Sequence, residues 1–174
     1  VYRNVHNNPT SEGCFRLAQE WVTRCNTTHA DCQRNASLTV WPTRLIDVSS
    51  LNPCLVESPG GGNIYLTLSY CWGTGPVEPE PSETGGYVQN AQSGGDEDSG
   101  TRYIVTTTRA TLGSRYHGIS ISRLPKTVQD AISVTRRFNV RYLWVDSLCI
   151  IQDSTEDWAN EASRMGDYYA GSYL

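Results

Sequence analysis

The spacing of apolar and polar residues predicts a helix near the N-terminus and two strands in the first half of the chain. Over residues 13–25, apolar side chains recur at helical spacing, which indicates an amphipathic helix. Residues 38–48 are typical of a strand, but Pro42 interrupts them, so we expect an edge strand or two short pieces. Residues 64–70 alternate between apolar and polar positions and give the clearest strand signal of this half.

The second half has a clearer succession of elements. A helix is predicted to open at residues 124–126, where a proline suits the first turn. Residues 140–146 are almost entirely apolar, as in a strand covered on both faces. Residues 154–157 match a capping box, which predicts a further helix. The positions expected to be buried are Val128, Ala131, Ile132, Thr135 and Phe138 in the first helix and Trp158, Ala162, Met165 and Tyr169 in the second.

Helix, strand and helix in quick succession predict an α/β domain whose mostly parallel sheet is flanked by helices. We treat residues 1–174 as a single domain with a helical lead-in over residues 1–37. Residues 102–106 favour a short strand, and residues 107–123 are predicted to be irregular. Because residues 172–174 are able to begin another strand, we expect the domain to be cut short at its C-terminus.

Charge is concentrated in one segment. Residues 74–100 hold six acidic residues and no lysine or arginine, and they are rich in glycine and proline, which predicts a mobile, disordered acidic insert. The net charge of −4 argues against nucleic acid as a partner. No run of apolar residues approaches the roughly 18 that a membrane span requires, so no membrane association is expected.

The six cysteines do not by themselves indicate a disulfide framework, because the chain shows no signal sequence. Cys71 and Cys149 lie in apolar segments, where a thiol is an ordinary small hydrophobic group. We therefore expect mostly free thiols and a cytoplasmic location. A nucleophilic cysteine with His117 and Asp146, or a zinc site at residues 25–32, is a weaker alternative, and we expect no metal.

Candidate chemistry gathers at the ends of two predicted strands. In open parallel sheets, sites form beyond the carboxyl ends of the strands. One strand is followed by Ser69, Tyr70, Cys71, Trp72 and Gly73, and the other by Asp146. If the strands are parallel neighbours, both tips face one crevice. A purely structural role stays open for each residue: Asp146 caps a turn, Trp72 closes the core and Gly73 permits a tight bend.

Glu161 is the second candidate carboxylate. On a helix it lies about 60° from Trp158 and about 40° from Met165, at the flank of the expected buried stripe. A carboxylate there can point into the crevice at the edge of the sheet. The alternative is a glutamate at the rim, paired with Arg164 three residues later.

Two long motifs resemble the heterokaryon incompatibility (HET) domain of filamentous fungi. Residues 65–73 resemble its first signature block, and residues 124–127 and 141–153, followed by 157–162, resemble its second. Residues 42–48 resemble the usual lead-in. The resemblance implies a cytoplasmic signalling domain that triggers programmed cell death on non-self recognition, a fungal form of innate immunity. Its expected partners are proteins, either a second copy or a sensor, with no nucleic acid and no membrane.

HET domains are distantly similar to Toll/interleukin-1 receptor (TIR) domains, which implies a three-layer, TIR- or flavodoxin-like fold. Several TIR domains hydrolyse NAD, so the resemblance also implies an alternative function, cleavage of the nicotinamide glycosidic bond, with NAD as substrate and no cofactor. Glu161 and Asp146 are then the catalytic candidates. The substrate-binding candidates are Ser69, Tyr70, Cys71, Trp72, Gly73, Arg44, Lys126 and Trp158. The signalling module and the enzyme both remain open on the sequence.

Overall fold

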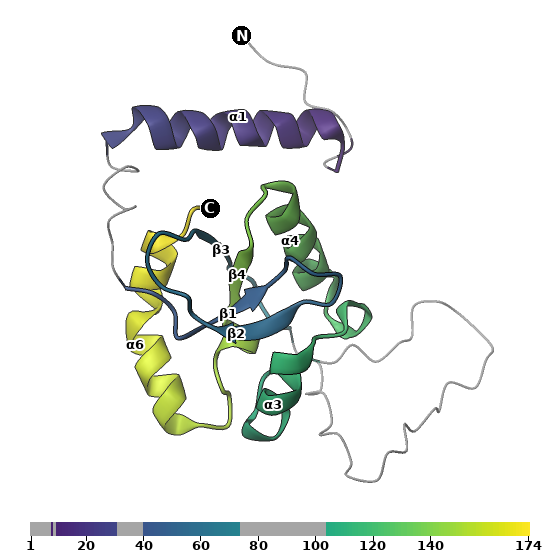
Figure 1. The fold of residues 1–174 in the computed structure, drawn as a ribbon, viewed down its shortest axis with the longest axis vertical. Helices are drawn as coiled ribbons and strands as arrows, with labels where there is room; N and C mark the ends of the chain where they lie inside the picture. The colour runs from purple at the N-terminus through teal and green to yellow at the C-terminus, as the bar shows by residue number, and fades with distance from the viewer. Residues whose placement is uncertain (1–7, 9, 31–39, 74–103) are drawn as a thin grey trace, which may run out of the picture.

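A single four-stranded sheet organises the domain. The computed structural model describes residues 8, 10–30, 40–73 and 104–174 (Figure 1). The predicted insert at residues 74–100 therefore lies outside the described residues. Within them the strand order is β2-β1-β4-β3. The strands are β1 (Arg44–Asp47), β2 (Cys54–Glu57), β3 (Tyr65–Leu68) and β4 (Tyr142–Val145).

The sheet is mixed, which corrects the prediction of a mostly parallel sheet. Strands β3 and β4 pair in parallel, but β1 is antiparallel to both β2 and β4. The physical reason is the short connection between β1 and β2, because a link of a few residues joins only antiparallel neighbours. The pattern missed β2, whose four residues lie between Pro53 and Pro59.

Strand β1 lies inside the sheet, and the prediction of an edge strand was wrong. All four of its residues are buried between β2 and β4. Pro42 stands two residues before the strand begins, so it removes no hydrogen bond from the ladder. The central position of β1 matters for the site, because it places Arg44 next to the helices of the C-terminal half.

Helices cover both faces of the sheet (Figure 1). On one face lie α3 (Arg109–His117) and α4 (Lys126–Arg137), and on the other lies α6 (Thr155–Gly171). Strand β4 is buried at every position, and α4 buries Val128, Ile132 and Thr135, as predicted. A short helix, α5 (Asp146–Cys149), follows β4 directly.

The segment predicted to be irregular, residues 107–123, contains a helix and a 3-10 turn. Helix α3 begins after Thr108, whose hydroxyl accepts from the Thr111 N–H, while the Thr111 hydroxyl accepts from the Thr108 N–H. The 3-10 turn η1 (Ile121–Arg123) follows. Helix α3 buries no residue completely, so it lacks the apolar periodicity that would have predicted it.

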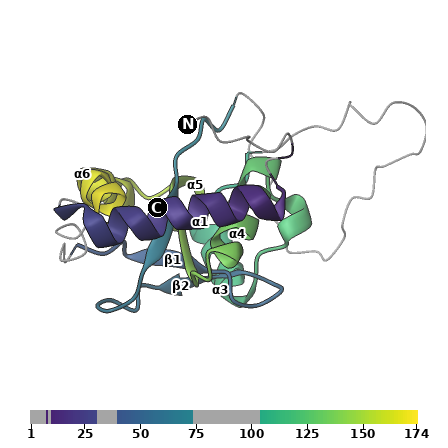
Figure 2. The ribbon, with the colours of Figure 1, turned by 90° about the horizontal axis from the view of Figure 1, so that it is seen from above.

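The predicted N-terminal helix is present as α1 (Glu12–Thr28), but it packs lightly. It has no fully buried residue and crosses one end of the molecule, near the C-terminus (Figure 2). It contacts the end of α4: the rings of Phe15 and Phe138 lie 6.4 Å apart, and the Arg137 guanidinium lies 3.5 Å from the Phe15 ring centroid. Among the described residues, no helix has the length and apolar character needed to cross a membrane.

Candidate functional site

The carboxyl ends of β3 and β4 meet at one edge of the sheet, as predicted. The two strands run parallel in direct register, with Leu68 opposite Val145. Just beyond them, Trp72 Nε1 donates to Asp146 Oδ1 at 3.0 Å, and the hydroxyls of Tyr70 and Ser147 lie 3.1 Å apart. The aromatic residues that follow β3 are therefore bonded to the first residues of α5.

Asp146 connects the residues that follow β3 to the start of α5. Its Oδ1 also accepts the Ser147 N–H at 2.7 Å, and its carbonyl accepts Gln152 Nε2 at 3.0 Å. Burial raises the pKa of the Asp146 carboxyl, against the opposing effect of the Trp72 hydrogen bond. The Asp146 carboxylate is therefore held by Trp72 and by the N–H of the next residue, which fits the structural role that the sequence left open beside a role in the crevice.

The other residues of this tip are more exposed. Ser69 and Cys71 face solvent, so the expectation of a buried Cys71 was wrong. Gly73 has a φ of 84°, in the left-handed region, which supports the predicted tight bend. Cys149 is buried, and burial raises the pKa of its thiol to about 12, which argues against a nucleophilic role.

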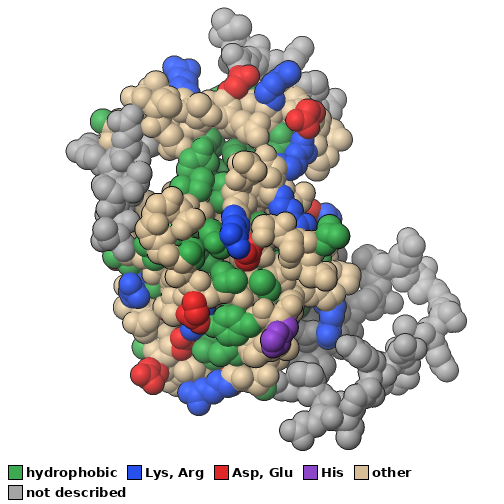
Figure 3. All heavy atoms as spheres, in the orientation of Figure 1, with side chains coloured by type: hydrophobic (Ala, Val, Ile, Leu, Met, Phe, Trp, Pro, Cys, Tyr) green, Lys and Arg blue, Asp and Glu red, His purple; other side chains and the backbone are tan. Residues whose placement is uncertain are grey.

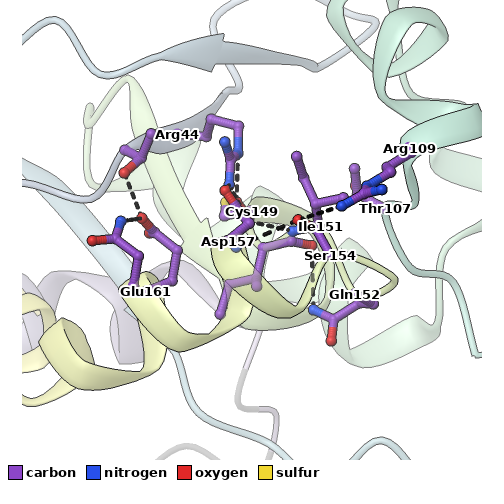
Figure 4. Close-up of polar contacts among 12 residues, drawn as sticks. Arg44, Thr107, Arg109, Cys149, Ile151, Gln152, Ser154, Asp157 and Glu161 are labelled. Carbon is purple, nitrogen blue, oxygen red and sulfur yellow. Dashed lines mark hydrogen bonds and ion pairs between the residues drawn. The ribbon is translucent and has the colours of Figure 1, made fainter.

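A second polar group joins β1 to α6 through Arg44 (Figure 4). Arg44 is 5% exposed, and its Nε donates to the Cys149 carbonyl at 2.8 Å. Its terminal nitrogen bonds the Asp157 carboxylate at 2.5–2.6 Å, and Asp157 also accepts the Ile151 N–H at 2.8 Å. Burial works to lower the pKa of Arg44, but the hydrogen bond and charge of Asp157 outweigh it and raise the pKa.

Glu161 lies inside the core beside this group (Figure 4). It is 0% exposed; its Oε1 accepts the Thr43 hydroxyl, and Asn160 Nδ2 donates to the same oxygen at 3.1 Å. Its Oε2 has no hydrogen-bond partner among the described residues. Buried Tyr168 is a neighbour, and burial together with the Glu161 charge raises the pKa of its phenol to about 12.

The predicted orientation of α6 therefore needs correction. Glu161 lies at the centre of the buried face, not at its flank, and Arg164 lies over the Tyr168 ring at 5.7 Å. Trp158, expected in the buried stripe, is 53% exposed. Residues 157, 161 and 168 lie on one face of α6, and this face packs against β1. Polar side chains at the start of β1 therefore determine how α6 is rotated about its own axis.

Lys126 and the surface hollows lie away from the polar group of Arg44, Asp157 and Glu161. Lys126 pairs with Asp130 on the exposed side of α4. Two hollows are prominent in the described part of the chain, one between β3 and α4 and one along α1, and neither is lined by Asp146 or Glu161. The structure thus brings Arg44 close to Glu161 and Trp72 close to Asp146, but it does not bring Lys126 to either group.

Comparison with known families matches residues 65–174, more than half of the chain, to the family described as heterokaryon incompatibility protein (HET). The chain belongs to the heterokaryon incompatibility family. Searches of curated proteins and of solved structures gave no significant match. The matched part of this HET domain includes both strand tips, Asp157 and Glu161, whereas Thr43 and Arg44 precede it.

Sequence reasoning missed the partners that hold the two α6 carboxylates. Thr43 and Asp157 appeared only within the HET-like motifs and, for Asp157, a helix cap, and neither was named as a candidate residue. One signal was available: Arg44 lies in an apolar strand, and a buried arginine almost always requires a carboxylate. The sequence does not say which carboxylate, because the partner lies more than 100 positions away.

Replacing Asp157 with asparagine is expected to destabilise the HET domain by about 3 kcal/mol or more, because it removes the ion-pair partner of the buried Arg44 guanidinium. The matched control is Asp130→Asn, which breaks the exposed ion pair with Lys126 and should cost about 0.5 kcal/mol or less. Urea unfolding of the three proteins measures both values. Equal effects of the two substitutions would contradict the structural role of Asp157.

The raised pKa of Asp146 predicts a pH-dependent contribution to stability. The unfolded chain loses this proton near pH 3.8 and the folded protein loses it at higher pH, so the free energy of unfolding declines as pH rises through this window. Asp146→Asn keeps an oxygen that can accept from Trp72 but does not ionise. The stability of wild type relative to this variant should therefore fall as the pH rises above about 3.8. A pH-independent difference in urea unfolding would show that the environment of Asp146 is wrong.

Proposed function

We propose that this HET domain is a cytoplasmic signalling domain that triggers programmed cell death in heterokaryon incompatibility, acting through contacts with protein partners. The family supplies the link to heterokaryon incompatibility. The observation that supports a module over an enzyme is the state of Glu161, which is 0% exposed and engaged by Thr43 and Asn160. Asp146 is likewise engaged, by Trp72 and the backbone of Ser147. Both candidate catalytic carboxylates hold elements of the fold together.

Surface charge supports proteins as the partners. The net charge is −4, and on the face drawn in Figure 3 the acidic and basic side chains are interspersed and do not form one patch of a single sign. Binding to nucleic acid or to an anionic membrane usually requires a basic surface. A second copy of the chain or a separate sensor protein remains the proposed class of partner.

Hydrolysis of NAD is the second candidate function, and one observation favours it. Glu161 Oε2 is buried without a hydrogen-bond partner among the described residues. Such groups are costly and each requires an explanation, of which a catalytic role is one. In this proposal, assembly would have to expose Glu161 before it could stabilise a positive charge on the ribose, with Trp158 available one turn earlier on the surface.

One experiment with two readouts separates the proposals. The chain is expressed from an inducible promoter in a filamentous fungus, and uptake of a vital dye and cellular NAD are followed for wild type, Glu161→Gln and the matched exposed control Glu156→Gln. The signalling proposal predicts that wild type and each variant that remains folded kill the cells, and that no loss of NAD precedes cell death. Loss of NAD before death, abolished only by Glu161→Gln, would establish the enzyme. No death from any folded variant would contradict the signalling proposal.

A further inference from the structure

Residues 40–43 pass along α6 immediately before the chain enters β1, and we call them the strap. At one end of the strap, the Thr43 hydroxyl donates to Glu161 Oε1, and Glu161 extends from α6 toward it (Figure 4). At the other end, the Val40 carbonyl lies beside Gly171, where α6 ends. The strap therefore lies against the second half of the helix.

Few interactions hold the strap in place. No hydrogen bond joins residues 40–42 to any other described residue. Val40 and Trp41 pack against the core but are not fully buried. The rings of Trp41 and Tyr65 lie 5.2 Å apart, and the Thr43 hydroxyl supplies the side-chain bond to α6. The strap is thus attached by apolar packing and one side-chain hydrogen bond.

The strap covers the polar part of the buried face of α6. Glu161 and Tyr168 on this face are both 0% exposed, and Thr43 lies next to the Tyr168 hydroxyl. Glu161 Oε2 and the Tyr168 hydroxyl have no hydrogen bond of good geometry among the described residues. Removing such atoms from water costs free energy that no bond returns. Lifting the strap would let water reach them, so part of the cost of opening is recovered.

Two movements would expose Glu161, and they differ in cost. Displacing α6 breaks the ion pair between Arg44 and Asp157 and so removes the partner of a buried guanidinium, which is strongly unfavourable. Lifting the strap breaks the Trp41 ring contact and the Thr43 hydroxyl bond, and it leaves Arg44 in β1. The strap is therefore the less costly part to move.

We propose that the strap is an autoinhibitory segment, which opens away from α6 while the sheet and the ion pair of Arg44 stay in place, and so exposes Glu161. A segment that precedes the matched family region thus controls access to a carboxylate inside it. This inference rests on the second candidate function in one respect, because hydrolysis of NAD is the activity that would require an exposed Glu161.

The test measures how fast the carboxyls of α6 react with a water-soluble carbodiimide and glycine ethyl ester in the purified, folded chain. Asp157 and Glu161 lie one turn apart, and mass spectrometry of peptides follows both in the same sample. Trp41→Ala removes the ring contact with Tyr65 and should make Glu161 react at least about tenfold faster than in the wild type. The rate at Asp157 should not change, because the strap does not hold its ion pair with Arg44.

Three further variants test the hydroxyl bond and the specificity of the effect. Thr43→Val removes the bond to Glu161 and should also speed its modification, whereas Thr43→Ser keeps a hydroxyl and should react at the wild-type rate. Trp21→Ala is the matched control, because Trp21 is 61% exposed on α1, and it should leave Glu161 unmodified. Circular dichroism and urea unfolding confirm that each variant is folded.

Two results would overturn the proposal. One is an unchanged rate at Glu161 in the folded Trp41→Ala and Thr43→Val proteins. The other is a parallel rise at Asp157, since that result requires α6 itself to move.

The labelling does not depend on activity, so the strap and the proposed function fail separately. Trp41→Ala is also expressed in the fungal cells, and cellular NAD is followed as for the wild type. If the variant exposes Glu161 and NAD falls earlier, both the strap and the enzyme are supported. If it exposes Glu161 and NAD is unchanged, the strap stands and hydrolysis by the exposed carboxylate is contradicted. If Glu161 stays unreactive, the strap proposal fails whatever the cells show.

Discussion

The ion pair between Arg44 and Asp157 is the interaction on which the arrangement of the HET domain depends. It joins a central strand to the helix on one face of the sheet, and it also fixes the segment between α5 and α6 through the Cys149 carbonyl and the Ile151 N–H. Burying a guanidinium is costly unless a carboxylate meets it in good geometry. That requirement sets the rotation of α6, and the rotation places Glu161 in the core and leaves Trp158 on the surface. The position of the candidate catalytic carboxylate is therefore a consequence of a contact made one turn earlier.

The tips of β3 and β4 form a second, simpler unit. Parallel pairing brings the residues after both strands to one edge, where Trp72 and Asp146 are bonded. This edge is where a ligand would bind in an open parallel sheet. In this HET domain its carboxylate already has protein donors, and the hollow beside β3 lies on the side of α4 instead. The polar contacts of the two units stabilise the fold.

How far the sequence predicted the structure depended on the range of the interactions. Helix α4 carries its own apolar periodicity and strand β4 a continuous apolar run, so local pattern was sufficient to find them and most of their buried residues. Strand β2 and helix α3 are short or weakly amphipathic, and only tertiary packing stabilises them. The meeting of the β3 and β4 tips followed from their parallel pairing. The contacts of Thr43 and Arg44 with α6 could not be predicted, because they join residues more than 100 positions apart and follow from the central place of β1.

The central claim is that Glu161 belongs to the core of the folded domain, and carboxyl labelling tests it most directly. The native protein is treated with a water-soluble carbodiimide and glycine ethyl ester, and the modification of Glu161 and Glu156 is followed by mass spectrometry of peptides. Both residues lie on α6, but Glu156 is exposed and Glu161 is 0% exposed. We predict rapid modification of Glu156 and none of Glu161 until the protein is unfolded in urea. Modification of both glutamates at similar rates in the native protein would contradict the account.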